Sequence, residues 1–202
     1  PIFSENITVR GVVENSNGPN NDGCDPESCK NVLIEDCYFN NGDDCIAIKS
    51  GRNNDGRKWN IPSKNIIVRN CIMKNGHGGV VIGSEISGGC SNVYVYSCKM
   101  SSPELDRAIR IKTNAIRGGL IENVFVKDVE IGQVKEAVLR INCLYEIRTE
   151  DGDFPPLIQN IYLENIISKE SRYTLYLQGL SKHESVKNIY IANSRFDGVK
   201  KE

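Results

Sequence analysis

The chain has 202 residues, with 25 Lys and Arg against 26 Asp and Glu and a net charge of −1. This length allows one domain with a substantial core, and the balanced charge excludes the global field that attracts nucleic acids or anionic membranes. The sequence also lacks the run of roughly 20 apolar residues that a membrane-spanning helix needs. We therefore expect neither nucleic acid nor membrane as a partner, and an acidic substrate would require a local cluster of basic residues.

Eight cysteines raise the question of a zinc site or a disulfide framework, but neither fits the sequence well. Cys24 and Cys29 lack the C-x-x-C spacing of zinc ribbons, and the chain has only two histidines, His77 and His183. The sequence therefore predicts no metal site, and a more ordinary role for the cysteines follows from the repeats.

A short pattern recurs seven times along the chain: an asparagine followed by apolar residues one and three positions later. The repeats begin at Asn6, Asn31, Asn65, Asn92, Asn123, Asn160 and Asn188. Alternation of this kind is typical of a strand, and a unit so short must stack on its neighbours to bury its apolar face. The intervening segments show no helical periodicity. The pattern predicts an all-β chain folded as a right-handed parallel β-helix, a solenoid of about seven rungs.

Equivalent positions of the repeats should form columns along such a solenoid. Cys37, Cys71 and Cys98 each lie six residues after the asparagine, so we expect them to stack as buried thiols rather than form disulfides or bind metal. The seven asparagines should form a ladder of side-chain hydrogen bonds between rungs. We interpret both columns as structural.

The first repeat, Asn6–Val9, resembles a rung from the middle of a solenoid because no polar cap precedes it. We therefore expect residues 1–202 to form a single β-helix domain that is the C-terminal portion of a longer catalytic domain, without its N-terminal cap. The exposed first rung would then be covered by another segment, or by a second subunit in an oligomer. Residues before Asn6 contain no signal peptide, but preceding sequence would account for this in a secreted protein.

Acidic residues concentrate in two short motifs. Asp22 and Asp25 lie in one motif, and Asp43 and Asp44 lie 21 residues beyond Asp22, which is about one solenoid turn. Adjacent rungs would bring these carboxylates together, where like charges raise each other's pKa as a general acid requires. Calcium binding and ordinary Asp-Gly turn chemistry are the alternatives for such a cluster.

Basic residues follow on the next rungs. His77 is flanked by glycines and precedes the apolar run Val80–Gly83, while Arg110 and Lys112 lie two residues apart in an expected strand. Both cations should therefore face outward with Ile111 toward the core. Either residue could be part of an ordinary soluble surface, but together near an acidic pair they indicate a site for an anionic sugar.

The four motifs Asn-x-Asp, Gly-Asp-Asp, Gly-His-Gly and Arg-Ile-Lys, in this order between residues 20 and 112, resemble those of the polygalacturonase family, glycoside hydrolase family 28. One departure is Asn21, where many members have threonine. The resemblance implies an inverting hydrolase that cleaves α-1,4-galacturonosyl linkages of polygalacturonate, an acidic polysaccharide of pectin. It further implies no cofactor and a secreted or periplasmic location.

The resemblance also assigns roles to residues of this chain. Asp43 would be the general acid, Asp22 and Asp44 would hold and deprotonate the attacking water, and His77 would orient the acid or maintain its proton. Arg110 and Lys112 would bind galacturonate carboxylates. Tyr145 is either a substrate contact or a surface residue. The remaining expectations are a supporting or turn role for Asp25 and a structural role for Lys49 as a partner of the acidic pair Asp43 and Asp44.

The segment 51–60 lengthens one excursion. Together with segments 25–28 and 83–85, it looks more like bacterial exo-acting members than fungal endo-acting ones. Within it, Arg52, Arg57 and Lys58 either bind the non-reducing-end sugar or are solvated charges. Alternatives to a polygalacturonase are a rhamnogalacturonan or xylogalacturonan hydrolase, and a pectate lyase, which would need calcium and an arginine base. A non-catalytic polysaccharide-binding β-helix would need aromatic platforms, and the chain has one tryptophan.

Overall fold

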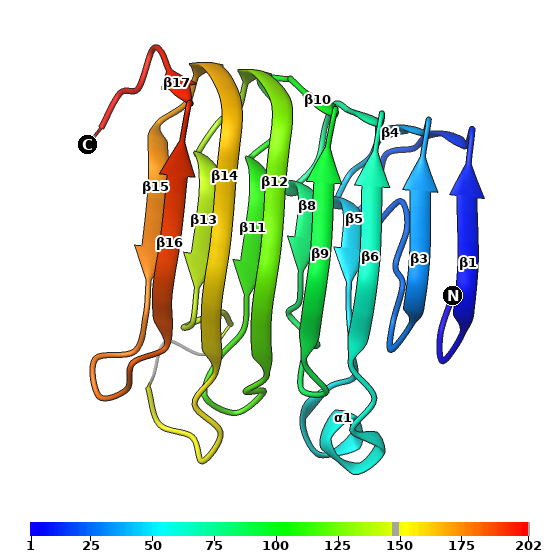
Figure 1. Ribbon diagram of the computed structural model, residues 1–202, viewed down its shortest axis with the longest axis vertical. Coiled ribbons are helices and arrows are strands. Elements are labelled where there is room, and N and C mark those ends of the chain that lie inside the picture. The colour runs from blue at the N-terminus through cyan, green and yellow to red at the C-terminus, as the bar shows by residue number, and fades with distance from the viewer. Residues whose placement is uncertain (147–149, 202) are drawn as a thin grey trace.

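The computed structural model describes residues 1–146 and 150–201, and its strands stack in columns along one axis (Figure 1). Every strand pairing among these residues is parallel, as in a β-helix. The predicted parallel β-helix is therefore confirmed.

Three columns of strands make up the coil, two of which merge where β12 and β14 run through both. The first contains β1 (Glu5–Arg10), β3 (Lys30–Glu35), β6 (Ser63–Arg69), β9 (Cys90–Tyr96), β12 (Leu120–Gln133), β14 (Leu157–Glu170) and β16 (Val186–Ala192). The second adds β2 (Val13–Asn15), β4 (Tyr38–Asn40), β7 (Ile72–Met73), β10 (Lys99–Met100) and β17 (Arg195–Phe196). The third column is a separate sheet, the site sheet, of β5 (Asp44–Ile48), β8 (Gly78–Ile82), β11 (Arg107–Lys112), β13 (Ala137–Asn142) and β15 (Tyr173–Gln178).

The expectation that every excursion is non-helical was wrong at one place, where segment 51–60 forms α1 (Asn53–Trp59). Asp55 in its first turn and basic residues in its last turn complement the helix dipole. Asn60 then ends the helix in the left-handed conformation and donates its N–H to the Gly56 carbonyl at 2.9 Å. In the described ranges no helix is long and apolar enough to cross a membrane.

The interior is filled by columns of β-branched side chains and by the expected column of thiols. Cys37, Cys71 and Cys98 are buried, and all eight cysteines are free. The prediction of stacked, unbridged thiols is therefore confirmed, and burial leaves them as small apolar side chains.

The asparagine ladder is also confirmed. Each amide nitrogen donates to the amide oxygen of the preceding rung, over six successive bonds of 3.0, 3.0, 3.0, 3.3, 3.2 and 3.1 Å. All seven asparagines have φ between 56° and 60°, a region that asparagine tolerates better than most residues. The same residue thus supplies both the backbone bend and the bond between rungs.

The solenoid is open at the β1 end. β1 pairs only with β3 among the described strands, and Phe3 and Val13 are exposed, Val13 by 75%. The ring of Phe3 lies 5.7 Å from that of the half-exposed Trp59 in α1, measured between centroids. That another segment or a second subunit covers this end remains a prediction.

The ladder makes a stability prediction at Asn92, which donates to Asn65 and accepts from Asn123. Asn92→Ala should lower the free energy of unfolding by about 3 kcal/mol, from two lost hydrogen bonds and a strained positive φ. Asn92→Gly should lose about 2 kcal/mol because glycine adopts that φ freely. Urea unfolding checks this order, and an alanine variant at least as stable as the glycine variant would contradict it.

Candidate active site

The site sheet brings the sequence motifs to one place because its strands are consecutive rungs. Asp44 begins β5 with Asp43 just before it, and His77 immediately precedes β8. Arg110 and Lys112 lie on β11, the next strand of the sheet. Asp22 comes from the preceding turn, where its Oδ1 accepts the backbone N–H of Asp44 at 3.1 Å.

Asp44 is the buried centre of the cluster, with 1% of its surface exposed. Its Oδ2 accepts from Lys112 Nζ at 2.7 Å and its Oδ1 from Arg110 Nη1 at 3.4 Å. Burial raises the pKa of Asp44, and the charges of Lys112 and Arg110 oppose that rise. Both cations face away from the core, as predicted, but they lie against a carboxylate rather than in solvent.

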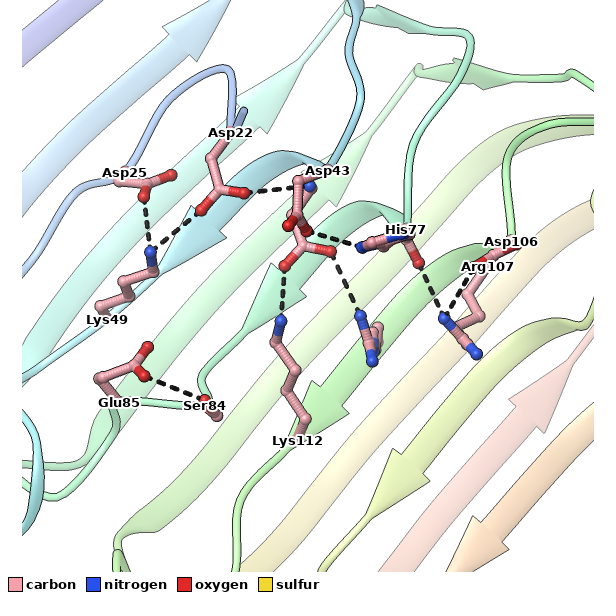
Figure 2. A network of polar contacts seen from close by, with 12 residues as sticks. Asp22, Asp25, Asp43, Lys49, His77, Ser84, Glu85, Asp106, Arg107 and Lys112 are labelled. Atoms are coloured by element: carbon pink, nitrogen blue, oxygen red, sulfur yellow. Dashed lines mark hydrogen bonds and ion pairs between the residues drawn. The ribbon is translucent and has the colours of Figure 1, made fainter. Parts of the chain in front are cut away.

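Asp43 pairs with the histidine of the next rung. His77 Nδ1 lies 2.9 Å from Asp43 Oδ1, and the imidazole is 52% exposed (Figure 2). Gly76 makes this approach possible because a Cβ there would lie 2.1 Å from the Asp43 carbonyl oxygen, and its φ is 131°. A side chain at position 76 would therefore collide with the backbone of Asp43, which explains the glycine before the histidine.

Asp22 and Asp25 share one lysine. Lys49 Nζ donates to Asp22 Oδ2 at 3.0 Å and to Asp25 Oδ2 at 2.6 Å (Figure 2). Burial would raise the pKa of Asp22, but hydrogen bonds from Asp25 and Lys49 and the charge of Lys49 bring it below the usual value. Burial raises the pKa of Asp25 to about 6, with Lys49 opposing the rise. The pKa values of the neighbouring carboxyls Asp22 and Asp25 are therefore shifted in opposite directions.

A cavity of about 400 Å³ opens over these groups. Its lining consists of Asn20, Asp22, Asp25, Asp43, Asp44, Lys49, Ser84, Glu85, Lys112, Tyr145 and Glu146. Tyr145 therefore lines the cavity, with its ring centroid 5.3 Å from the Arg110 guanidinium and 5.1 Å from Lys112 Nζ. His77 lines a second hollow, of about 330 Å³. Arg110 does not line the main cavity itself but donates to Asp44, which does.

Sequence reasoning missed a buried arginine beside this cavity. Arg117 is 2% exposed and donates through Nη2 to Glu85 at 3.4 Å and to Glu146 at 2.8 Å. Arg52 also approaches Glu146, at 3.9 Å. These contacts join loops of different rungs, so no local motif in the sequence indicates them.

Arg107, three residues before Arg110 on the same strand, was also missed. Its Nη1 donates to the His77 carbonyl at 3.3 Å and to Asp106 Oδ2 at 3.2 Å, and its Nε donates to Glu136 (Figure 2 shows the first two). Arg107 thus fixes the backbone of the histidine that contacts Asp43. In the sequence, only its place in the same expected strand as Arg110 could have indicated a role for Arg107.

The three basic residues of segment 51–60 make different contacts. Arg57 donates through Nη1 to the carbonyls of Ile116 and Arg117, at 2.9 and 3.1 Å, and lies 3.6 Å from the Phe154 ring centroid. It therefore fastens α1 to the neighbouring turn. Lys58 lies over the Trp59 ring at 5.7 Å, and Arg52 is the one of the three that approaches a cavity-lining residue.

Calcium was the alternative explanation for the acidic cluster. Asp43, Asp44 and His77 do offer ligand atoms within 4.8 Å of one another. However, Asp44 already accepts from two cations, and a histidine nitrogen is not the oxygen ligand that calcium prefers. The donor set therefore fits proton chemistry better than a calcium site.

With the geometry established, comparison with known proteins identifies the family. The family model described as glycosyl hydrolases family 28 matches residues 2–202. The chain belongs to glycosyl hydrolase family 28. The resemblance drawn from the four motifs is thereby confirmed.

Relatives in this family include enzymes of plant and bacterial origin. The chain is 31% identical over 186 residues to a probable polygalacturonase of Vitis vinifera, covering 89% of this chain and 37% of that protein. It is 30% identical over 140 residues to an exo-poly-alpha-D-galacturonosidase of Dickeya chrysanthemi, covering 68% and 23%. This chain therefore spans less than half the length of either relative.

Among solved structures, a hyperthermoactive exopolygalacturonase from Thermotoga maritima superposes with a TM-score of 0.94 at 41% identity. That match covers 99% of this chain and 44% of the Thermotoga chain. An endopolygalacturonase from Stereum purpureum matches with a TM-score of 0.65 at 20% identity, covering 98% and 61%, and supports the fold alone. Both neighbours share the fold of this chain.

Breaking the Asp44–Lys112 ion pair should destabilise the protein strongly, and a second substitution at Asp44 should restore much of the stability. Lys112→Met should lower the free energy of unfolding by about 3–5 kcal/mol because it leaves Asp44 buried with only the more distant Arg110. Adding Asp44→Asn should recover much of that loss. Lys99→Met breaks an exposed pair with Glu130 and should change stability by less than about 1 kcal/mol. A double variant no more stable than Lys112→Met, in chemical denaturation, would contradict this explanation.

Proposed function

We propose that the protein is a polygalacturonase that hydrolyses α-1,4-galacturonosyl linkages of polygalacturonate with inversion. One observation carries the proposal: two carboxyl groups with different partners line one cavity together with the buried Lys112. Asp43 contacts His77, and Asp22 contacts Lys49. Paired carboxylates with separate acid and base roles are the requirement of glycoside hydrolysis. Family membership supports the same chemistry.

Asp43 is the proposed general acid that protonates the glycosidic oxygen as the bond breaks. Its carboxyl reaches the cavity, and the His77 contact at 2.9 Å fixes the orientation of Oδ1. Because the imidazole is half-exposed, it can pass a proton from solvent to the acid between turnovers. Arg107 keeps the histidine backbone in place through its carbonyl.

Asp22 is the proposed base, acting with Asp44 to hold the attacking water. A base must be ionised, and the Lys49 charge together with the Asp44 N–H stabilises the Asp22 carboxylate. Asp44 presents a second acceptor in the same cavity, with its charge balanced by Lys112 and Arg110. The water therefore has acceptors on two sides, and its proton passes to Asp22.

Lys112, Arg110 and Tyr145 are the proposed contacts to galacturonate. An ammonium group has three donors, and Asp44 is the only acceptor recorded for Lys112 among the described residues, so further donors remain for a sugar carboxylate. The Tyr145 ring beside both cations offers an apolar face to the sugar ring. This combination suits a negatively charged sugar better than a neutral one, which favours galacturonan over a rhamnogalacturonan.

We further propose exo action and secretion. Exo action is supported by likeness to the Thermotoga maritima exopolygalacturonase and the Dickeya chrysanthemi exo-poly-alpha-D-galacturonosidase. It is also supported by Arg117, which links the cavity-lining residues Glu85 and Glu146 and so holds one side of the cavity in place. Arg57 of α1 holds the same turn through the Ile116 carbonyl. A fixed side of the cavity would limit how far a chain can extend. Secretion follows from the substrate, because pectin lies outside the cell.

The proposed acid makes the first activity prediction. Asp43→Asn should lower kcat on polygalacturonate by about 10²-fold or more, since it removes the proton donor, while leaving the melting temperature close to that of the parent. A reducing-sugar assay measures the loss. Asp197→Asn, at an exposed carboxylate of the C-terminal segment, is the matched control and should retain activity. An Asp43→Asn variant with parental turnover would reject the assignment.

Product analysis tests the finer parts of the proposal in the same reactions. Early products should be monomer alone, and the first-formed anomer seen by NMR should have the configuration opposite to that of the cleaved linkage. A ladder of oligomers would mean endo action instead. An unsaturated product that absorbs in the near ultraviolet and requires Ca²⁺ would mean a lyase.

Lys49 makes a prediction about pH dependence. Lys49→Met removes the cation that keeps the pKa of Asp22 low, so burial should raise that pKa and the base should ionise only at higher pH. The acidic limb of the kcat/KM profile should therefore move to higher pH, whereas Lys49→Arg should keep it near its parental position. A limb that does not move in Lys49→Met would show that Asp22 does not set it.

A further inference from the structure

One rung beyond Arg110 the site sheet carries a second arginine at the same position. Arg140 on β13 is the register partner of Arg110, and Tyr176 on β15 is the register partner of Arg140. Lys112, Asn142 and Gln178 form the neighbouring column in the same way. Because residues two apart on a strand share a face, Arg140 and Tyr176 lie on the face that carries Lys112 and the cavity.

Arg140 has no ion pair in the described part of the chain, unlike Arg110 and Arg117 of the same region. It is 7% exposed, and no ion pair of its guanidinium exists with the described residues 1–146 and 150–201. Arg110 contacts Asp44, and Arg117 contacts two glutamates. A buried charge without an ion pair is costly, and the charge of Glu136 acts on Arg140 only from a distance. An anion that binds from outside would offset that cost.

The contacts of Arg140 are all with neutral groups and hold the guanidinium in place. Nη1 donates to the carbonyls of Ile141 at 2.6 Å and Tyr176 at 3.0 Å, and Nη2 donates to Gln178 Oε1 at 2.8 Å. Burial lowers the pKa of Arg140, although a guanidinium keeps its charge across the physiological range. N–H donors on Nε and Nη2 remain, and that edge can grip a carboxylate with two parallel bonds.

An aromatic ring accompanies this cation, as at Arg110. The Arg140 guanidinium lies 3.7 Å from the Tyr176 ring centroid, and Tyr176 is 36% exposed. Tyr173 lies against Tyr176 with centroids 4.8 Å apart. Tyr145 has the corresponding place beside Arg110 and Lys112. The pairing of a cation with a tyrosine ring is therefore repeated along the face.

We propose that Arg140 and Tyr176 form a binding site for an additional galacturonate, with Arg140 holding its carboxylate and Tyr176 packing against its ring. Neighbouring rungs are about 4.8 Å apart, so this sugar would lie next to the one held by Arg110 and Lys112. The inference rests on the proposed function, since it names a further contact of the same substrate. It predicts preference for chains of three or more galacturonates with a free carboxylate at this position.

The test measures binding of digalacturonate and trigalacturonate by titration calorimetry in the inactive Asp43→Asn background. Arg140→Gln should weaken trigalacturonate binding by about tenfold more than digalacturonate binding, a difference of about 1.4 kcal/mol. Arg140→Lys should retain part of the preference because it keeps the charge. A fully methyl-esterified trigalacturonate should show no dependence on Arg140. Arg195→Gln, the matched control at an exposed arginine of β17, should change neither affinity.

Several outcomes would overturn the inference. Equal weakening of both ligands in Arg140→Gln, especially with a lower melting temperature, would mean that Arg140 only clamps β13 to β15. An Asp43→Asn protein that binds trigalacturonate no more tightly than digalacturonate would also reject it. Failure of the proposed function is separately visible, because the Asp43→Asn protein would then bind neither ligand and the parent would release no reducing sugar from polygalacturonate.

Discussion

The structure depends on one repeated hydrogen bond, in which each rung's asparagine donates its amide to the asparagine of the rung before. This bond and the positive φ of the same residue fix where each turn begins. Excursions that differ in length by more than ten residues are therefore absorbed in the loops, without shifting the strands. As a result, residues far apart in sequence, such as Asp44 and Lys112, meet at one point of the site sheet.

Fixed register also explains how the protein tolerates four carboxyls in a small volume. Each buried carboxylate meets a cation from its own or a later rung: Asp22 meets Lys49, and Asp44 meets Lys112 and Arg110. The compensation is unequal, because burial raises the pKa of Asp44 and Asp25 while the pKa of Asp22 is lowered. The lowered pKa suits the role proposed for Asp22, because a general base must be ionised.

The sequence predicted the features that repeat and missed those that do not. The ladder and the thiol column follow from periodicity, because stacking converts it into proximity. The placement of His77 beside Asp43 was implied by the family resemblance. Contacts such as Arg117 to Glu146 or Arg57 to the carbonyl of Ile116 depend on how loops of unequal length fold against each other. Periodicity carries no information about them. Helix α1 was missed for the same reason, since it lies outside the repeat.

Segment 51–60 also determines what an optical experiment can report. The single tryptophan, Trp59, is half-exposed in α1 and lies beside Phe3 of the first turns. The stacked rings of Tyr94, Phe125, Tyr162 and Tyr190 lie on later strands. Indole emission therefore follows the early turns, whereas tyrosine dichroism follows the later ones. Solenoids are held by nearest-neighbour contacts and can melt from one end. The two signals together distinguish concerted unfolding from fraying that begins at one terminus.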